Sequence, residues 1–193
     1  MKENSLYTHN QDPSRRFFAF DMFGTLVRSR QRDMDDLFKV FYGFFPEHTP
    51  EEVQREYERF YSDFETTHGM HSEYSIRMLM DHMNKRFGTD VDAFDAEERM
   101  MRGTRMFVTI PGAVDTLGYF REKGYRIAVL SNTTYSSSVV KGVLEDNGGF
   151  EGLIDCVVTS AEVGYRKPDM RCFQAVVDKL GARKEDCFFA GDS

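Results

Sequence analysis

The hydrophobic positions of this chain follow two different spacings, and the places where the spacing changes divide it into parts. Residues 17–20 form a short apolar run that ends at Asp21. Gly24 follows too soon for a helix, so the run predicts a buried strand. In residues 28–108 the apolar side chains recur at helical spacing, which is typical of amphipathic helices. Beyond residue 112, short apolar runs alternate with helical patterns.

Four helices are expected in residues 28–108. The apolar residues that indicate the first three are Met34, Leu37, Phe38, Phe41 and Phe45, then Val53, Tyr57, Phe60, Tyr61 and Phe64, then Tyr74, Ile76, Leu79, Met80, Met83 and Phe87. Thr49 is placed to cap the second helix, with Pro50 at its first position and Glu52 reaching back to the cap. The fourth helix is expected over residues 94–105. The segment shows no strand pattern, so we predict an all-helical insertion.

Strands and helices alternate in the last part of the chain. Strands are expected at residues 127–130, 156–159 and 187–190, and helices at residues 114–120, 139–144 and 173–180. This alternation implies parallel βαβ units. We therefore predict an α/β fold, a Rossmann-like parallel sheet with helices on both faces, interrupted after its first strand by an all-helical cap domain. The predicted organisation is a loose N-terminal leader at 1–16, a core at 17–27 and 109–193, and a cap at 28–108.

Composition and charge narrow the class of protein. Hydrophobic residues make up 40% of the 193 positions, enough for one domain with a sizeable core and a modest insertion. The net charge of -7 argues against a nucleic-acid partner, because neutralising phosphates needs a basic face. No apolar run approaches the roughly 18 residues of a membrane span, and no signal peptide is visible. Cys156, Cys172 and Cys187 are odd in number and lie in apolar patterns, so we expect reduced thiols in a cytoplasmic protein without a membrane partner.

Polar side chains follow each of the predicted strands. Asp21 ends the first strand, Ser131 and Asn132 follow the second, Lys167 comes after the third, and Asp192 follows the fourth. Taken singly, each has an ordinary interpretation as a helix cap, a turn residue or a solvated charge. In an open parallel sheet, however, ligands bind outside the carboxyl ends of the strands. Groups of this kind at every strand end therefore predict one shared catalytic crevice.

These positions also carry a family resemblance. The sequences FDMFGTLV around Asp21, LSN around Ser131 and Asn132, RKPD around Lys167 and AGDS around Asp192 resemble the four ordered motifs of the haloacid dehalogenase superfamily. The resemblance extends over residues 17–193. The helical insertion between the first two motifs looks like that family's cap of the first type.

The resemblance implies a role for each motif. Asp21 is expected to be the nucleophile and to form an aspartyl intermediate. Ser131, with Asn132 alongside, is expected to hold the transferring group, and Lys167 to neutralise charge between the two carboxylates. A carboxylate is a weak nucleophile, and it becomes useful when a cation offsets its repulsion from an anionic substrate. The implied activity is hydrolysis of a small phosphorylated metabolite.

A metal ion belongs to the same expectation. The resemblance implies Mg²⁺ bound by Asp21, Asp192 and the backbone carbonyl of Phe23. Mg²⁺ takes oxygen ligands, usually one or two carboxylates together with substrate phosphate. Two close carboxylates without a cation would repel each other, and one would tend to take up a proton. We therefore expect Mg²⁺ as the cofactor and a small phosphate ester as the substrate; no oligomeric state is predicted.

Phe23 departs from the phosphatase pattern and supports an alternative. Phosphatases of the family carry an Asp at this position that protonates the leaving group, a contribution typically worth about 10²–10⁴-fold. The 2-haloacid dehalogenases carry an aromatic residue there, because halide needs no proton to leave. Those dehalogenases are metal-free, however, and lack the Gly-Asp-Ser form of the fourth motif. The first motif thus favours a dehalogenase and the fourth favours Mg²⁺-dependent phosphoryl transfer.

A second departure lies at the end of the chain. The sequence stops at Ser193, whereas family members continue with a further acidic residue, a helix and usually another strand. The chain is then either truncated or an incomplete domain. Together with Phe23, this leaves a third alternative, a catalytically degenerate protein that keeps the fold and binds a ligand without turning it over.

Overall fold

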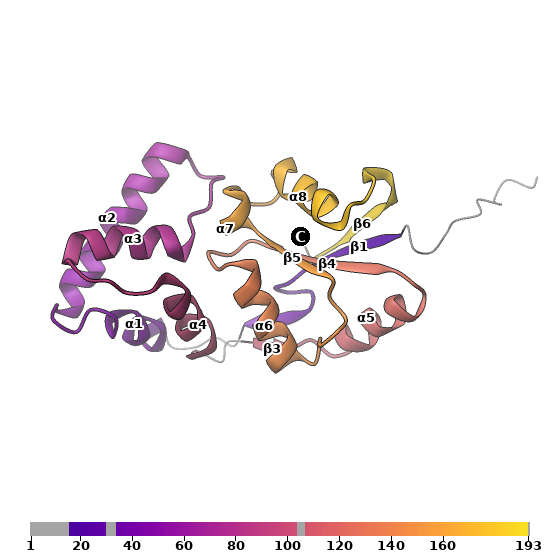
Figure 1. The fold of residues 1–193 in the computed structure, drawn as a ribbon, viewed down its shortest axis with the longest axis horizontal. Coiled ribbons are helices and arrows are strands. Elements are labelled where there is room, and N and C mark those ends of the chain that lie inside the picture. Colours follow the sequence, from indigo (N-terminus) through magenta and orange to yellow (C-terminus); the bar gives the residue numbers. More distant parts are fainter. Residues whose placement is uncertain (1–15, 30–33, 104–106, 193) are drawn as a thin grey trace, which may run out of the picture.

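The computed structural model describes residues 16–29, 34–103 and 107–192. Within them, the strands β1 (Phe17–Asp21), β4 (Arg126–Ser131), β5 (Cys156–Thr159) and β6 (Cys187–Ala190) form a parallel sheet in the order β5-β4-β1-β6 (Figure 1). The predicted strands are confirmed. The leader expected at 1–16 lies outside the described residues except for Arg16.

Alternating side chains on the strands explain why helices cover both faces of the sheet. Successive residues of a strand point to opposite faces. One set packs with Cys172, Val176 and Leu180 of α8 (Met170–Leu180): Phe17, Ala19, Ala128, Leu130 and Val158. The other set joins the larger core that contains α5 (Ala113–Glu122) and α6 (Ser137–Gly148): Phe20, Ile127, Val129 and Val157. The structure thus confirms an α/β fold with helices on both faces of a parallel sheet (Figure 1).

Helices occupy most of the predicted insertion. They are α1 (Met34–Tyr42), α2 (Pro50–His68), α3 (Ile76–Phe87) and α4 (Ala93–Gly103), and they gather at one end of the molecule beside the sheet (Figure 1). The cap of α2 is confirmed: the Thr49 hydroxyl accepts from the Glu52 N–H at 3.3 Å, and the Glu52 carboxylate accepts from the Thr49 N–H at 2.9 Å. The last residues expected in the fourth helix, 104 and 105, lie outside the described residues.

The insertion differs from the prediction at its two ends, where short strands occur. The strands β2 (Val27–Ser29) and β3 (Phe107–Thr109) pair antiparallel, with Val27 opposite Thr109. Three-residue strands give no periodic pattern, and their partners are far apart in sequence, so the local pattern did not reveal them. The pairing brings together the points where the chain leaves the sheet region and returns to it. The division into a core and a cap at residues 28 and 108 remains an interpretation.

Two further short elements shape the loops near the carboxyl end of the sheet. Helix α7 (Ser160–Val163) follows β5 directly and separates that strand from Lys167. The 3₁₀ helix η2 (Lys184–Asp186) precedes β6. Among the described residues, no helix is long and apolar enough to cross a membrane.

Candidate active site

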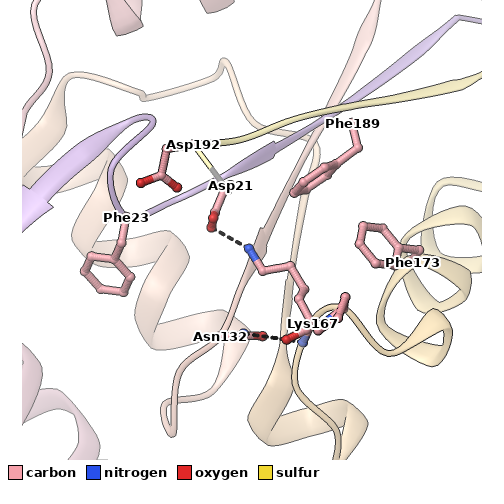
Figure 2. Close-up of a pocket in the computed structure, with 8 residues that line it drawn as sticks. Asp21, Phe23, Asn132, Lys167, Phe173, Phe189 and Asp192 are labelled. Carbon is pink, nitrogen blue, oxygen red and sulfur yellow. Dashed lines mark hydrogen bonds and ion pairs between the residues drawn. The ribbon is translucent and has the colours of Figure 1, made fainter. Parts of the chain in front are cut away.

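Asp21 stands at the carboxyl end of β1, in the interior of the sheet. Its Oδ1 accepts a hydrogen bond from the Met22 N–H at 2.7 Å and lies 2.6 Å from the Nζ of Lys167 (Figure 2). The two side chains are only 10% and 13% exposed, so solvent ions screen this ion pair less than a surface pair. The structure therefore brings together the predicted nucleophile and the predicted cation.

The Asn132 side chain forms hydrogen bonds with both the N–H and the carbonyl of Lys167. The N–H of Lys167 donates to the Asn132 Oδ1 at 2.7 Å, and the Asn132 Nδ2 donates to the Lys167 carbonyl at 3.2 Å. The Lys167 ammonium also donates to the Leu130 carbonyl at 3.2 Å and lies 5.4 Å from the centre of the Phe189 ring. An aromatic face attracts a cation, so the ring adds to the contacts that hold the ammonium beside Asp21.

Asp192 follows β6, the neighbour of β1, and its carboxylate lies against Gly24 in the turn after Asp21 (Figure 2). Gly24 has φ +80°, a backbone conformation that favours glycine. A Cβ at this position would come within 2.1 Å of Asp192 Oδ2. The absence of a side chain at Gly24 therefore lets the Asp192 carboxylate approach this turn, a requirement that the sequence reasoning did not identify.

These side chains share one pocket of about 430 Å³ (Figure 2). Its lining residues are Asp21, Phe23, Asn132, Lys167, Pro168, Phe173, Phe189 and Asp192. Five of the six predicted site residues are in this list. The sequence predicts Phe173 in a helix and Phe189 in a strand. Apolar residues in such patterns are normally core, so the sequence does not indicate these two as site residues. Their rings meet edge to face at a centroid separation of 5.2 Å.

Ser131 is the predicted site residue that does not line the pocket. It ends β4 and is completely buried. Within the described part of the chain its Oγ has no hydrogen-bond partner. A buried hydroxyl without a partner is energetically unfavourable, so this atom calls for a functional or structural explanation.

Phe23 lies at the side of the pocket (Figure 2). Its ring packs against Phe107 of β3 with a centroid separation of 5.5 Å. The position predicted to lack an acid–base carboxylate is therefore filled by a ring that contacts the end of the insertion. The acidic side chains among the lining residues are Asp21 and Asp192. No group of three or more His, Cys, Asp or Glu residues that could hold a metal occurs in the described ranges.

A second pocket, of about 350 Å³, lies between the helices of residues 28–108 and the loops after β4 and β5. Its lining residues are Ser75, Arg77, Glu97, Ser136, Ser138, Ala161 and Glu162. Glu97 is fully buried and accepts a hydrogen bond from the Ser136 hydroxyl through Oε2. Burial raises the pKa of the Glu97 carboxyl, although the hydrogen bond from Ser136 and the charge of Arg77 oppose this effect.

Comparison with known proteins agrees with the family resemblance. Residues 16–193 match the family model described as haloacid dehalogenase-like hydrolase. The chain is 33% identical over 82 residues to glyceraldehyde 3-phosphate phosphatase of Methanothermobacter thermautotrophicus, covering 42% of this chain and 35% of the relative. It is 30% identical over 100 residues to (S)-2-haloacid dehalogenase 1 of a Pseudomonas species, covering 51% of this chain and 43% of the relative. The matches thus span less than half the length of these curated relatives.

Solved structures resemble the chain over more of its length. A HAD phosphatase from Thermococcus onnurineus has a TM-score of 0.56 at 21% identity, with coverage of 92% of this chain and 77% of that one. A dehalogenase solved with an intermediate complex has a TM-score of 0.53 at 19% identity, with coverage of 93% and 77%. Identities this low establish the fold alone. The family model matches far more than half of the chain, and the protein therefore belongs to the haloacid dehalogenase-like hydrolases.

Proposed function

We propose that this hydrolase cleaves a small phosphorylated substrate, with Mg²⁺ as its cofactor, through an aspartyl-phosphate on Asp21. The observation that carries the proposal is the position of Asp192, whose carboxylate lies against the Gly24 turn next to Asp21. A metal-free displacement of halide requires one carboxylate nucleophile. A second carboxylate at this point is explained by a cation between the two.

The residues present suit Mg²⁺. Asp21 and Asp192 supply carboxylate oxygens, and the backbone carbonyl of Phe23 belongs to the same turn as Gly24. All three are hard oxygen donors, which Mg²⁺ prefers, and the remaining positions would be filled by water and substrate phosphate. When bound, Mg²⁺ would offset the negative charge of the phosphoryl oxygens and orient the group for in-line attack.

Asp21 performs the first step. Its carboxylate oxygen forms a bond to phosphorus while the bond from phosphorus to the leaving oxygen breaks, and the leaving group departs with the bonding electrons. Lys167, 2.6 Å from Asp21, keeps the carboxylate oriented and reduces its repulsion from the anionic substrate. In the second step water attacks phosphorus, the bond to Asp21 breaks, and the protons of water pass to phosphate and solvent. The carboxylate of Asp21 is regenerated.

Phe23 limits which leaving groups can depart readily. No proton can come from this position, so the departing oxygen must be stable as an anion or take its proton from water. Aryl and acyl phosphates meet that condition better than sugar or nucleoside phosphates. The pocket of about 430 Å³ is in the size range of small-molecule sites. A small phosphate ester with a good leaving group is therefore the substrate class that the site favours.

A second candidate activity is metal-free dehalogenation of a 2-haloacid, with Asp21 displacing halide from carbon. The observation that favours it is the aromatic wall of the pocket, made of Phe23, Phe173 and Phe189. Such a wall suits a small apolar carbon chain and a halide that needs no proton. The carboxylate of Asp192 against the Gly24 turn is left without a role in this alternative.

A panel of aryl phosphates, alkyl phosphates and 2-haloacids, each with and without Mg²⁺, separates the candidates. The account predicts Mg²⁺-dependent release of phosphate, abolished in Asp21→Asn and unchanged in the control Asp63→Asn, which alters an exposed residue of α2. Metal-independent halide release would establish the second candidate instead. Binding of phosphate without turnover of any compound would establish a degenerate binding protein.

A further inference from the structure

The backbone that carries Lys167 is joined to the helical insertion. Residues 71–73, just before α3, pair with residues 164–166: the Arg166 N–H donates to the His71 carbonyl at 2.8 Å, and the Glu73 N–H donates to the Gly164 carbonyl at 3.0 Å. Ser72 and Tyr165 form an antiparallel bridge between these bonds. The residue directly before Lys167 is therefore fixed by a segment nearly a hundred positions away.

The side chain of Glu73 strengthens this junction. Its Oε2 lies 2.7 Å from the Arg166 Nη1 and accepts from the Ser160 Oγ at 2.9 Å. The Glu73 side chain is 2% exposed, whereas that of Arg166 is 45% exposed. A buried carboxylate is strongly unfavourable unless it is paired and hydrogen-bonded. Burial raises the pKa of Glu73, and the contacts with Arg166 and Ser160 oppose that rise.

Two series of contacts connect Glu73 with Lys167. The first passes through Arg166, the preceding residue in the chain. The second passes through Ser160, whose Oγ accepts from the Thr133 N–H at 2.8 Å. Thr133 follows Asn132, whose side chain holds the N–H and the carbonyl of Lys167. Both series end on the backbone of the residue whose ammonium contacts Asp21.

We propose that Glu73 is a positioning residue, which acts from the insertion through Arg166 and Ser160 to hold the Lys167 ammonium against Asp21. The inference rests on the proposed function, because it assigns Lys167 a part in the reaction. Glu73 itself does not line the site pocket. An ion pair that only fastened the insertion to the sheet region would change stability and leave the rate of the chemical step unaltered.

Glu73→Gln is the principal test, since it keeps the shape and an oxygen for Ser160 but removes the charge that Arg166 pairs with. We expect kcat for an aryl phosphate with Mg²⁺ to fall about tenfold, with KM little changed. This loss is smaller than the roughly 10²-fold that a 1 Å misplacement can cost. Arg166→Gln should lower kcat by a similar factor. The double variant should be no worse than the poorer single variant, because both changes break one connection.

Glu56→Gln is the matched control. Glu56 is also a buried glutamate of the insertion and also pairs with an arginine, Arg86, at 3.1 Å, but its other partner is His82 of α3. It has no contact with the Lys167 segment among the described interactions. Glu56→Gln should keep the parent's kcat once folding is verified. A similar loss in this control would show that any weakened insertion slows the enzyme, which overturns the specific role of Glu73.

Hydrogen–deuterium exchange gives a readout that does not depend on activity. Glu73→Gln should speed exchange of the amides in residues 164–167, and Glu56→Gln should not. Unchanged exchange in that segment, kcat within twofold of the parent, or losses that multiply in the double variant would each overturn the inference. If the parent hydrolysed no phosphate ester, the proposed function would fail, while the exchange comparison would still decide whether Glu73 holds this segment.

Discussion

Replacing Gly24 by alanine tests whether the approach of Asp192 to the first turn matters for metal binding. The added Cβ would lie 2.1 Å from Asp192 Oδ2 and 2.6 Å from its Cγ. Asp192 is exposed, so its side chain can rotate away while the backbone stays in place. Gly24→Ala should therefore move one of the two carboxylates proposed to bind Mg²⁺ and leave the other near Lys167.

The cost in stability has two parts that a control separates. A side chain at φ +80° costs about 1–2 kcal/mol, and an unfavourable rotamer at Asp192 adds about 0.5–1.5 kcal/mol. Gly112 has φ +83°, and a Cβ there would meet no atom within 4 Å. Gly112→Ala should therefore carry only the backbone cost. The two variants should differ in unfolding free energy by about 1 kcal/mol without metal.

Urea unfolding with and without Mg²⁺ is the assay. A ligand that binds the folded state stabilises it by RT ln(1 + [L]/Kd), so a tenfold loss of affinity removes about 1.4 kcal/mol at saturating metal. We expect that loss in Gly24→Ala and the full Mg²⁺ stabilisation in Gly112→Ala. Equal stabilisation of both variants and the parent would refute the assignment of Asp192 as a ligand.

Three further changes test other parts of the account. Phe23→Asp removes the contact with Phe107 and restores a carboxyl group near Asp21. It should raise turnover of alkyl phosphates more than turnover of aryl phosphates, by at most about 10²–10⁴-fold. Equal or lower rates on both substrates in a folded, metal-replete variant would show that the missing carboxylate is not limiting. Ser131→Ala should raise the unfolding free energy, by up to about 1–3 kcal/mol, because it removes a buried hydroxyl that has no described partner. It should nevertheless lower kcat about tenfold or more if the hydroxyl donates to the phosphoryl group, and an unchanged kcat would remove Ser131 from the site. Burial raises the pKa of Glu97 from its ordinary 4.5, so its contribution to stability is present below that pH and is lost as the pH rises through the folded value. Glu97→Gln, which mimics the protonated form, should therefore become more stable relative to the parent in urea unfolding as the pH rises above 4.5, and a constant difference would contradict the burial argument.

The sheet and the positions of its polar strand ends could be predicted because both depend on local signals. Short apolar runs between glycines indicated the strands, and parallel strands place their carboxyl ends at one edge. Asp21, Asn132, Lys167 and Asp192 accordingly reach one pocket. Their contributions to catalysis remain predictions, as does the division into a core and a cap.

The features that escaped prediction depend on contacts between distant segments. The strand pair β2–β3 joins residues about 80 positions apart, and three-residue strands leave no periodic trace. The sequence pattern placed Ser131 at the strand end. It did not predict that Ser131 is completely buried, because burial depends on packing from neighbouring strands. Glu73 precedes the third predicted helix and belongs to no motif, and its proposed role rests on its contacts with Arg166 and Ser160.

The central claim is that Asp21 carries the phosphoryl group during turnover. The most direct measurement is acid quenching of the enzyme during steady-state turnover of an aryl phosphate with Mg²⁺, followed by peptide mass spectrometry. The account predicts a phosphoryl group on the peptide that contains Asp21, removed by hydroxylamine and absent both without Mg²⁺ and in Asp21→Asn. Turnover of the phosphate with no adduct on Asp21, or an adduct formed there only from a 2-haloacid and without metal, would contradict it.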